Sequence, residues 1–127
     1  MPSTEVIILR ELLAAESGQV SGARLAKLLG VSRVAVWMQL QKLTRQGFEF
    51  EALRSRGYRL VRTPDQLHPA LIQAYLGGRG RAPQLVCLGT VDSTNSEAER
   101  QLAAGGAMPL VILARAQTEG RGRRGRP

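Results

Sequence analysis

Two polar segments in the second half of the chain have residue types that suit ligand binding. The first, VDSTNSEAE, follows the apolar run QLVCLGTV and presents Asp92, Ser93, Thr94 and Asn95 in a row. Serine, threonine and asparagine offer short, oriented donors and acceptors for a polar head group. Taken alone, these residues are better explained as a helix cap, because Asp, Ser and Asn cap helices routinely.

The second polar segment, QTEGRGRRGR, begins at Gln117 and follows the apolar run PLVILARAQ. Its glycines let backbone N–H groups converge on an anion, and its arginines add positive charge and planar donor forks. A flexible Arg/Gly tail that coats single-stranded RNA is an alternative interpretation, and so is a low-complexity end. The segment is not a P-loop, which requires lysine followed by serine or threonine.

The surrounding apolar runs predict how these two segments are positioned. Residues 84–91 read as a buried strand, a helix begins near Thr94, and residues 109–117 read as a second buried strand. Strand, helix and strand predict a βαβ unit with parallel strands, as in α/β domains. Ligands of such sheets bind in the loops at the carboxyl ends of the strands. We therefore expect the two polar segments to lie side by side.

The first 62 residues predict a different architecture, built on three short helices. Apolar residues recur at helical spacing in TEVIILRELLAAE, SGARLAKLLG and SRVAVWMQLQKLTRQG, with Leu25, Leu28 and Leu29 expected on one face of the second helix. Gly30 supplies the tight turn between the second and third helices. The spacing predicts a helix-turn-helix whose third helix is free to enter the major groove of DNA.

A two-stranded wing is predicted directly after the third helix. FEFEAL alternates apolar and acidic residues, and RSRGYRL returns as its partner across a turn near residues 54–57. The candidate DNA-binding residues are those on the exposed helix face and at the wing tip, namely Ser32, Arg33, Val34, Trp37, Met38, Gln41, Arg54 and Arg56. Trp37 and Met38 are more apolar than a groove-reading face usually is, so docking to another protein stays open as an alternative.

Composition and charge agree with a partner that is a polyanion. The formal net charge is +8, and residues 21–62 alone carry nine Lys and Arg against two Glu. A single cysteine, Cys87, excludes a disulfide framework and is typical of the reducing cytoplasm, where we expect the protein to reside. No apolar run approaches the ~20 residues that span a bilayer, so no membrane partner is expected. Residues 63–69, with two prolines, read as a linker between the winged helix of residues 1–62 and a second domain of residues 70–127.

The combination of motifs resembles the bifunctional biotin protein ligases that also repress the biotin operon. The resemblance rests on SGARLAKLLGVSRVAV, RGYRL, DSTN and GRGRRGR in this order, and it covers almost the whole chain. It implies an α+β fold class, with a winged helix-turn-helix followed by the start of a biotin/lipoate-ligase-like α/β domain. In this family, biotin and ATP (with Mg²⁺) form biotinyl-5′-AMP, and biotin is then transferred to a lysine of the biotin carboxyl carrier protein.

The resemblance also implies roles for particular residues. Ser93, Thr94 and Asn95 match the triplet that meets biotin, and Gln117 matches a contact on the following strand. The loop that closes over biotin and the adenylate is matched by Arg121, Gly122 and Arg123, of which Arg123 is the catalytic candidate. In the family, biotinyl-5′-AMP acts as corepressor, and the adenylate-bound protein forms a homodimer on operator DNA.

One feature of the family is missing from the chain. A lysine downstream of the arginine loop contacts biotin and phosphate in the family, whereas Lys27 and Lys42, both in the winged helix, are the only lysines here. We therefore expect the chain to be a fragment that does not make biotinyl-5′-AMP by itself. The alternatives are a winged-helix transcription regulator without ligase activity and an Arg/Gly-rich RNA-binding protein.

Overall fold

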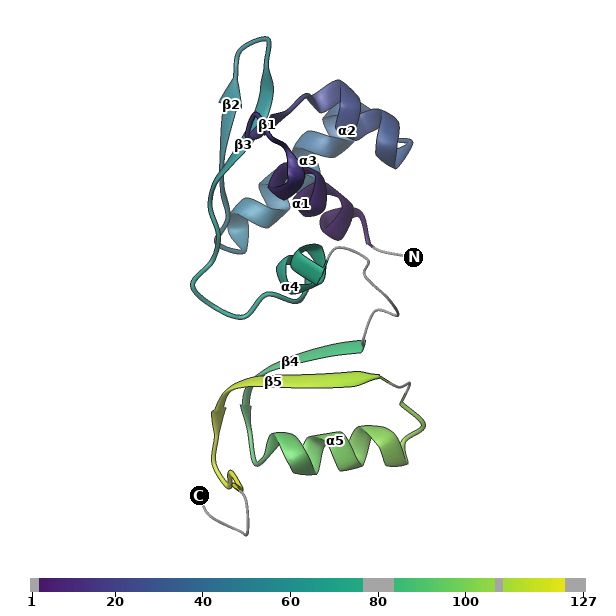
Figure 1. Ribbon diagram of the computed structural model, residues 1–127, viewed down its shortest axis with the longest axis vertical. Helices are drawn as coiled ribbons and strands as arrows, with labels where there is room; N and C mark the ends of the chain where they lie inside the picture. The colour runs from purple at the N-terminus through teal and green to yellow at the C-terminus, as the bar shows by residue number, and fades with distance from the viewer. Residues whose placement is uncertain (1–2, 77–83, 107–108, 123–127) are drawn as a thin grey trace. The chain divides into compact units, whose positions relative to one another are not determined.

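The computed structural model describes residues 3–76, 84–106 and 109–122 (Figure 1). The chain is α+β and divides into two compact units, residues 1–65 with 70–77 and residues 66–69 with 78–127. The first unit contains α1 (Thr4–Ala14), β1 (Gln19–Val20), α2 (Gly22–Leu29), α3 (Arg33–Arg45), β2 (Glu49–Leu53), β3 (Gly57–Arg62) and most of α4 (Pro69–Leu76). The second unit contains β4 (Gln84–Val91), α5 (Thr94–Ala103) and β5 (Leu110–Gln117).

Serine residues begin all three helices of the predicted helix-turn-helix. Ser3, Ser21 and Ser32 each precede a helix, and each hydroxyl oxygen accepts a hydrogen bond from the backbone N–H three residues later. Such caps satisfy an N–H group that has no partner within the helix. Gly30 ends α2 with a φ of 67°, a left-handed conformation that glycine adopts without steric cost.

The core of the first unit joins the three helices to the wing. Its buried apolar residues come from α1, β1, α2, α3 and the residue before β2, and are Val6, Ile8, Leu9, Leu12, Val20, Leu25, Val36, Leu40, Leu43 and Phe48. The prediction that Leu28 faces inward with Leu25 is wrong, because Leu28 is 49% exposed. Helix α2 has only eight residues, and of these only Leu25 is fully buried in the core.

The wing is a three-stranded sheet in the order β1-β3-β2, all antiparallel. The sequence predicted β2 and β3 but not β1, whose two residues are too short to show an alternating pattern. Gly57 pairs with Leu53 at the base of the turn and has a φ of 105°. A Cβ at this glycine would lie 2.2 Å from the carbonyl oxygen of Val20, so the close approach of β1 to β3 requires glycine.

Helix α4 packs against the first unit. Ala70 and Ala74 are buried in one cluster with Val6, Leu9 and Leu43. The sequence placed this helix at the start of the second domain, residues 70–127. The compact N-terminal unit therefore includes residues after position 62, among them most of α4. The functional domain boundaries stay a prediction.

The second unit has the predicted strand–helix–strand order. Strands β4 and β5 pair in parallel, with Leu85 opposite Val111 and Val91 opposite Gln117, and α5 connects them (Figure 1). The carboxyl ends of both strands therefore lie at the same edge of the sheet. Both polar segments begin at this edge. In the described residues, no helix is long and apolar enough to cross a membrane.

Candidate functional site

The outer face of α3 carries the side chains that the sequence singled out for DNA binding. All six residues are exposed. Val34, Trp37, Met38 and Gln41 lie opposite the buried Val36, Leu40 and Leu43, whereas Ser32 and Arg33 are at the start of the helix. The exposed fractions are large for apolar residues, at 67% for Val34, 51% for Trp37 and 60% for Met38. The predicted orientation of α3 is therefore confirmed, while contact with DNA stays a prediction.

Some cations of the first unit have an anionic partner within it and others have none in the ranges that the structure describes. Arg24, Lys42, Arg59 and Arg62 form ion pairs with glutamates of the same unit. In the described part of the chain, Arg33 and Arg45 on α3 and Arg54 and Arg56 at the wing tip form no ion pair. Arg10 on α1 and Lys27 on α2 also form no ion pair among the described residues, but four of the six cations without such a partner lie on α3 and the wing tip, where they can attract an external anion.

A hollow of about 340 Å³ lies between the wing, the start of α2 and the start of α3. Arg33 and Arg56 line it, together with Gly22 and Ala23 in the first turn of α2. Backbone N–H groups at the start of a helix and nearby arginines both favour an anion such as a phosphate. The turn at the wing tip is closed by a 3.1 Å hydrogen bond from the N–H of Arg56 to the carbonyl of Leu53. This bond holds the backbone of Arg56 in place beside the hollow.

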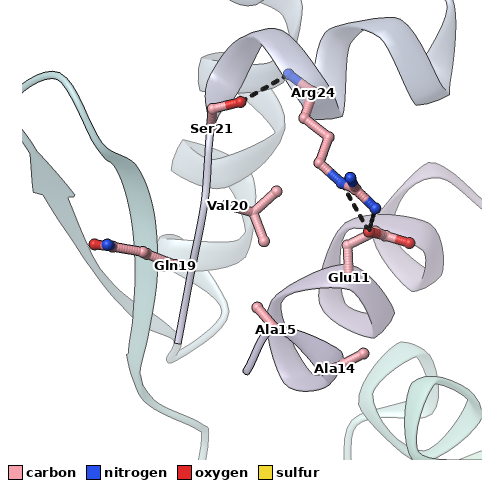
Figure 2. Close-up of a pocket in the computed structure, with 7 residues that line it drawn as sticks. All are labelled: Glu11, Ala14, Ala15, Gln19, Val20, Ser21 and Arg24. Carbon is pink, nitrogen blue, oxygen red and sulfur yellow. Dashed lines mark hydrogen bonds and ion pairs between the residues drawn. The ribbon is translucent and has the colours of Figure 1, made fainter. Parts of the chain in front are cut away.

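A second hollow, of about 390 Å³, lies beside β1 (Figure 2). Ala14, Ala15 and Val20 line it, and its two charged residues pair with each other across the hollow, Arg24 donating to Glu11 at 3.3 Å. Since these charges satisfy one another, this hollow offers no group suited to bind a charged ligand.

In the second unit, the two polar segments lie side by side. The backbone N–H groups of Thr118 and Glu119 donate to the carbonyl oxygens of Val91 and Asp92, at 2.9 and 2.7 Å. These bonds extend the pairing of β4 and β5 beyond the strands. The residues that follow each strand are thus brought together, as the parallel βαβ arrangement predicts.

Gln117 connects the end of β5 to the start of α5. Its Oε1 accepts hydrogen bonds from the backbone N–H of Thr94 at 2.8 Å and from the Thr94 hydroxyl at 3.1 Å. The amide of Gln117 therefore fixes Thr94 through its oxygen, and its Nε2 group remains a donor. The family resemblance predicted Gln117 as a ligand contact, but nothing in the sequence indicated its hydrogen bonds with Thr94.

Ser93 and Asn95 flank Thr94 in different environments. Ser93 is 1% exposed and caps α5, its Oγ accepting from the N–H of Ser96 at 3.4 Å. The helix-cap interpretation of this segment is therefore correct. A capping hydroxyl keeps its own hydrogen for donation. Asn95 is exposed, so its amide is accessible to solvent or a ligand.

Arg100 holds the turn before α5 in place. It donates two hydrogen bonds to the carboxylate of Asp92, at 3.0 and 2.7 Å, and also bonds Glu97. The hydrogen bonds from Arg100, and then from the N–H of Ser93, lower the pKa of Asp92 to about 2. The pKa of Glu97 is also lowered, first by Gln101 and then by Arg100. The spacing of Glu97 and Arg100 suggests an ion pair within the helix, but the link to Asp92 depends on the fold of the turn.

The arginine loop is described as far as Gly122. Arg121 donates to the Ser96 hydroxyl at 3.1 Å and lies 3.7 Å from the carboxylate of Glu99, both on α5. Arg121 and Gly122 are exposed. Arg123, the catalytic candidate, lies outside the described residues.

Metal ligation or thiol chemistry in the second unit would depend on its described acidic, histidine and cysteine side chains. Within residues 3–76, 84–106 and 109–122, no group of three His, Cys, Asp or Glu residues could hold a metal ion. Partial burial raises the pKa of the Cys87 thiol, which disfavours the nucleophilic thiolate. The described side chains of the two polar segments offer hydrogen-bond donors and acceptors and positive charge.

The fold and its exposed α3 define the first unit as a winged helix-turn-helix domain, and residues 7–59 match the family described as HTH domain. The chain is also 33% identical over 107 residues to the bifunctional ligase/repressor BirA of Bacillus spizizenii and to that of Bacillus subtilis (strain 168). Each match covers 84% of the chain but only 33% of the relative, so the chain spans about a third of their length. The chain is therefore related to the N-terminal portion of the bifunctional ligase/repressors.

Proposed function

We propose that the first unit binds operator DNA and represses transcription. Helix α3 enters the major groove, and Arg54 and Arg56 contact the phosphate backbone beside it. The concentration of unpaired cations on α3 and the wing tip is the observation that supports this function best. Phosphate contacts of this kind supply affinity that does not depend on sequence, and the exposed face of α3 supplies base reading.

We further propose that the second unit contributes the biotin and adenylate site of a biotin protein ligase. In the complete protein, biotin reacts with ATP to give biotinyl-5′-AMP and pyrophosphate, and biotin is then transferred to a lysine of the biotin carboxyl carrier protein. Mg²⁺ accompanies ATP as part of that substrate. The juxtaposition of Thr94 with Gln117, and of Ser96 with Arg121, supports a shared site at this sheet edge.

The proposed residues contribute binding and orientation rather than covalent chemistry. At the polar head of biotin, the exposed Asn95 donates and accepts hydrogen bonds, and the Thr94 hydroxyl, whose hydrogen goes to Gln117, accepts one. Ser93, which is 1% exposed and caps α5, has only its hydroxyl hydrogen left to donate, and the Nε2 of Gln117 adds a donor. Arg121, Gly122 and Arg123 offset the repulsion between the biotin carboxylate and the triphosphate, which must approach each other before the bond forms. The loop also keeps the reactive mixed anhydride from water.

The adenylate links the two functions in this proposal. Ordering of the arginine loop on biotinyl-5′-AMP favours a homodimer, and the dimer binds operator DNA in the cytoplasm. The chain spans only a third of its relatives, and it lacks the downstream lysine of the family. We therefore assign the ligase reaction to a protein that contains the remaining ligase residues.

A test of the ligase proposal uses the complete protein with Arg123→Gly. The variant should release biotinyl-5′-AMP and biotinylate lysines of bystander proteins such as serum albumin, detected with labelled streptavidin. Arg115→Gly, a change on the exposed part of β5, serves as the control and should retain the adenylate. If the complete wild-type protein transfers no biotin to a carrier domain but still binds DNA, the second hypothesis holds, a winged-helix regulator without ligase activity.

A further inference from the structure

The exposed face of α3 carries a stripe of apolar side chains where a DNA-reading helix usually carries polar ones. Val34, Trp37, Met38 and Gln41 follow one another at steps of three, one and three residues, so they share one face of the helix. All four are exposed, and none of them contributes to the core of the unit. We call these four residues the α3 stripe.

Charge around the α3 stripe selects its partner. Helix α3 contains no acidic residue, and Arg33 and Arg45 near its two ends form no ion pair among the described residues. The wing arginines Arg54 and Arg56 are equally unpaired. The partner that suits this surface is a polyanion, which the unpaired arginines attract, and it must also present apolar groups to the α3 stripe.

The major groove of DNA offers such groups in one place only, the C5-methyl group of thymine. Val and Met side chains cannot read hydrogen-bond donors or acceptors, but they can bury that methyl group. Gln41, at the end of the α3 stripe, can accept from and donate to the edge of adenine. The same A·T base pair therefore suits both the apolar residues and the amide.

We propose that Val34, Trp37 and Met38 read DNA through thymine methyl groups, so that the protein prefers A·T-containing sites because of the methyl and not through an arginine–guanine code. This inference rests on the proposed binding of DNA by the first unit. It names the chemical group that the α3 stripe recognises.

The test compares duplexes that differ only in the C5-methyl group. Alternating d(A-T) is compared with alternating d(A-U), and alternating d(G-C) with its 5-methylcytosine form, by fluorescence anisotropy at low ionic strength with the 127-residue chain. Each methyl group that the α3 stripe buries should tighten binding about four-fold. Methyl-bearing duplexes should bind more tightly in both pairs, which separates the methyl effect from differences in base pairing or duplex shape.

Variants locate the effect. Val34→Ala with Met38→Ala should lower the affinity ratio of d(A-T) to d(A-U) toward one, with Trp37 retaining part of the methyl contact. Val61→Ala removes a comparably exposed apolar side chain on β3, at 53% exposure, and should leave the ratio as in the wild type. Circular dichroism should show folded protein in both cases, because all three substituted residues are exposed. Trp37, the only tryptophan in the chain, should change its fluorescence on binding d(A-T).

The possible failures are distinguishable. Salt-dependent binding with equal affinity for d(A-T) and d(A-U) would overturn the thymine proposal and leave DNA binding standing. No binding to any duplex would remove the proposed function and this inference together. Self-association in sedimentation that Val34→Ala with Met38→Ala abolishes would show that the α3 stripe is a protein interface, which also overturns the inference.

Discussion

The side chain of Gln117 accepts two hydrogen bonds from Thr94, one from its backbone N–H at 2.8 Å and one from its hydroxyl at 3.1 Å. Twenty-three positions separate the two residues in the sequence. The bond joins the last residue of β5 to the first residue of α5, and thus ties together the two segments proposed to hold biotin.

Substitution of Gln117 separates this structural bond from the proposed ligand contact. Gln117→Ala should destabilise the second unit by about 1 kcal/mol or less, since both bonds lie at the surface, and should speed hydrogen exchange of the Thr94 amide. Gln117→Glu keeps an oxygen that accepts both bonds, so exchange at Thr94 should stay slow by NMR. The same change removes the Nε2 donor, and in the complete protein it should weaken biotin binding in calorimetry. Equal biotin affinity in wild type and Gln117→Glu would contradict the proposed ligand contact.

Removal of Arg100 should restore an ordinary pKa at Asp92. In the folded chain this carboxyl has a pKa of about 2 rather than 3.8, because Arg100 bonds its charged form. In Arg100→Gln the carboxyl pKa should rise toward 3.8, measured by NMR titration of its carboxyl carbon, whereas Arg115→Gln should leave it unchanged.

The same bond gives the stability of the second unit a defined dependence on pH. Because the pKa of Asp92 is lower in the folded state than in the unfolded state, its ionised carboxylate stabilises the fold. This contribution is complete above pH 3.8 and is lost as the pH falls from 3.8 toward 2. Arg100→Gln should therefore reduce the difference in stability between pH 5 and pH 2, measured by thermal denaturation. An unchanged difference would show that the Arg100–Asp92 pair adds nothing to folding.

Two glycines with positive φ provide a matched pair of substitutions in the first unit. A Cβ at Gly57 would lie 2.2 Å from a backbone oxygen of Val20, whereas a Cβ at Gly30 would meet nothing within 4 Å. Gly30→Ala should cost about 1 kcal/mol from its left-handed backbone alone. Gly57→Ala should cost about 3 kcal/mol, because β1 and β3 must also move apart. Chemical denaturation monitored by Trp37 fluorescence measures both changes, and similar losses would mean that β1 does not pack closely against Gly57.

The wing arginines should govern the salt dependence of DNA affinity. Arg54→Ala with Arg56→Ala should reduce the slope of log affinity against log salt by about 1.8, if each arginine neutralises one phosphate. Arg59→Ala is the control, because Arg59 already pairs with Glu51 in the wing. Anisotropy titrations over a range of salt concentrations measure both slopes, and an unchanged slope in the double variant would mean that the wing tip does not contact DNA.

The sequence by itself determined much of the local structure. Helical spacing identified Val34, Trp37, Met38 and Gln41 as exposed residues of α3, and turn residues located the wing. The alternation of apolar runs and a helix predicted the parallel βαβ unit. These features depend on periodicity and on residues near in sequence, so a single chain is enough to reveal them.

Only the tertiary structure decided which distant groups meet. It paired β1 with β3, packed Ala70 and Ala74 of α4 into the first core, left Leu28 exposed, and joined Gln117 to Thr94. It also divided the cations into those with an internal partner and those without. Each of these outcomes depends on contacts between residues far apart in the chain. A periodic pattern shows which residues share a face, but it does not show which distant element that face packs against or which charges form ion pairs.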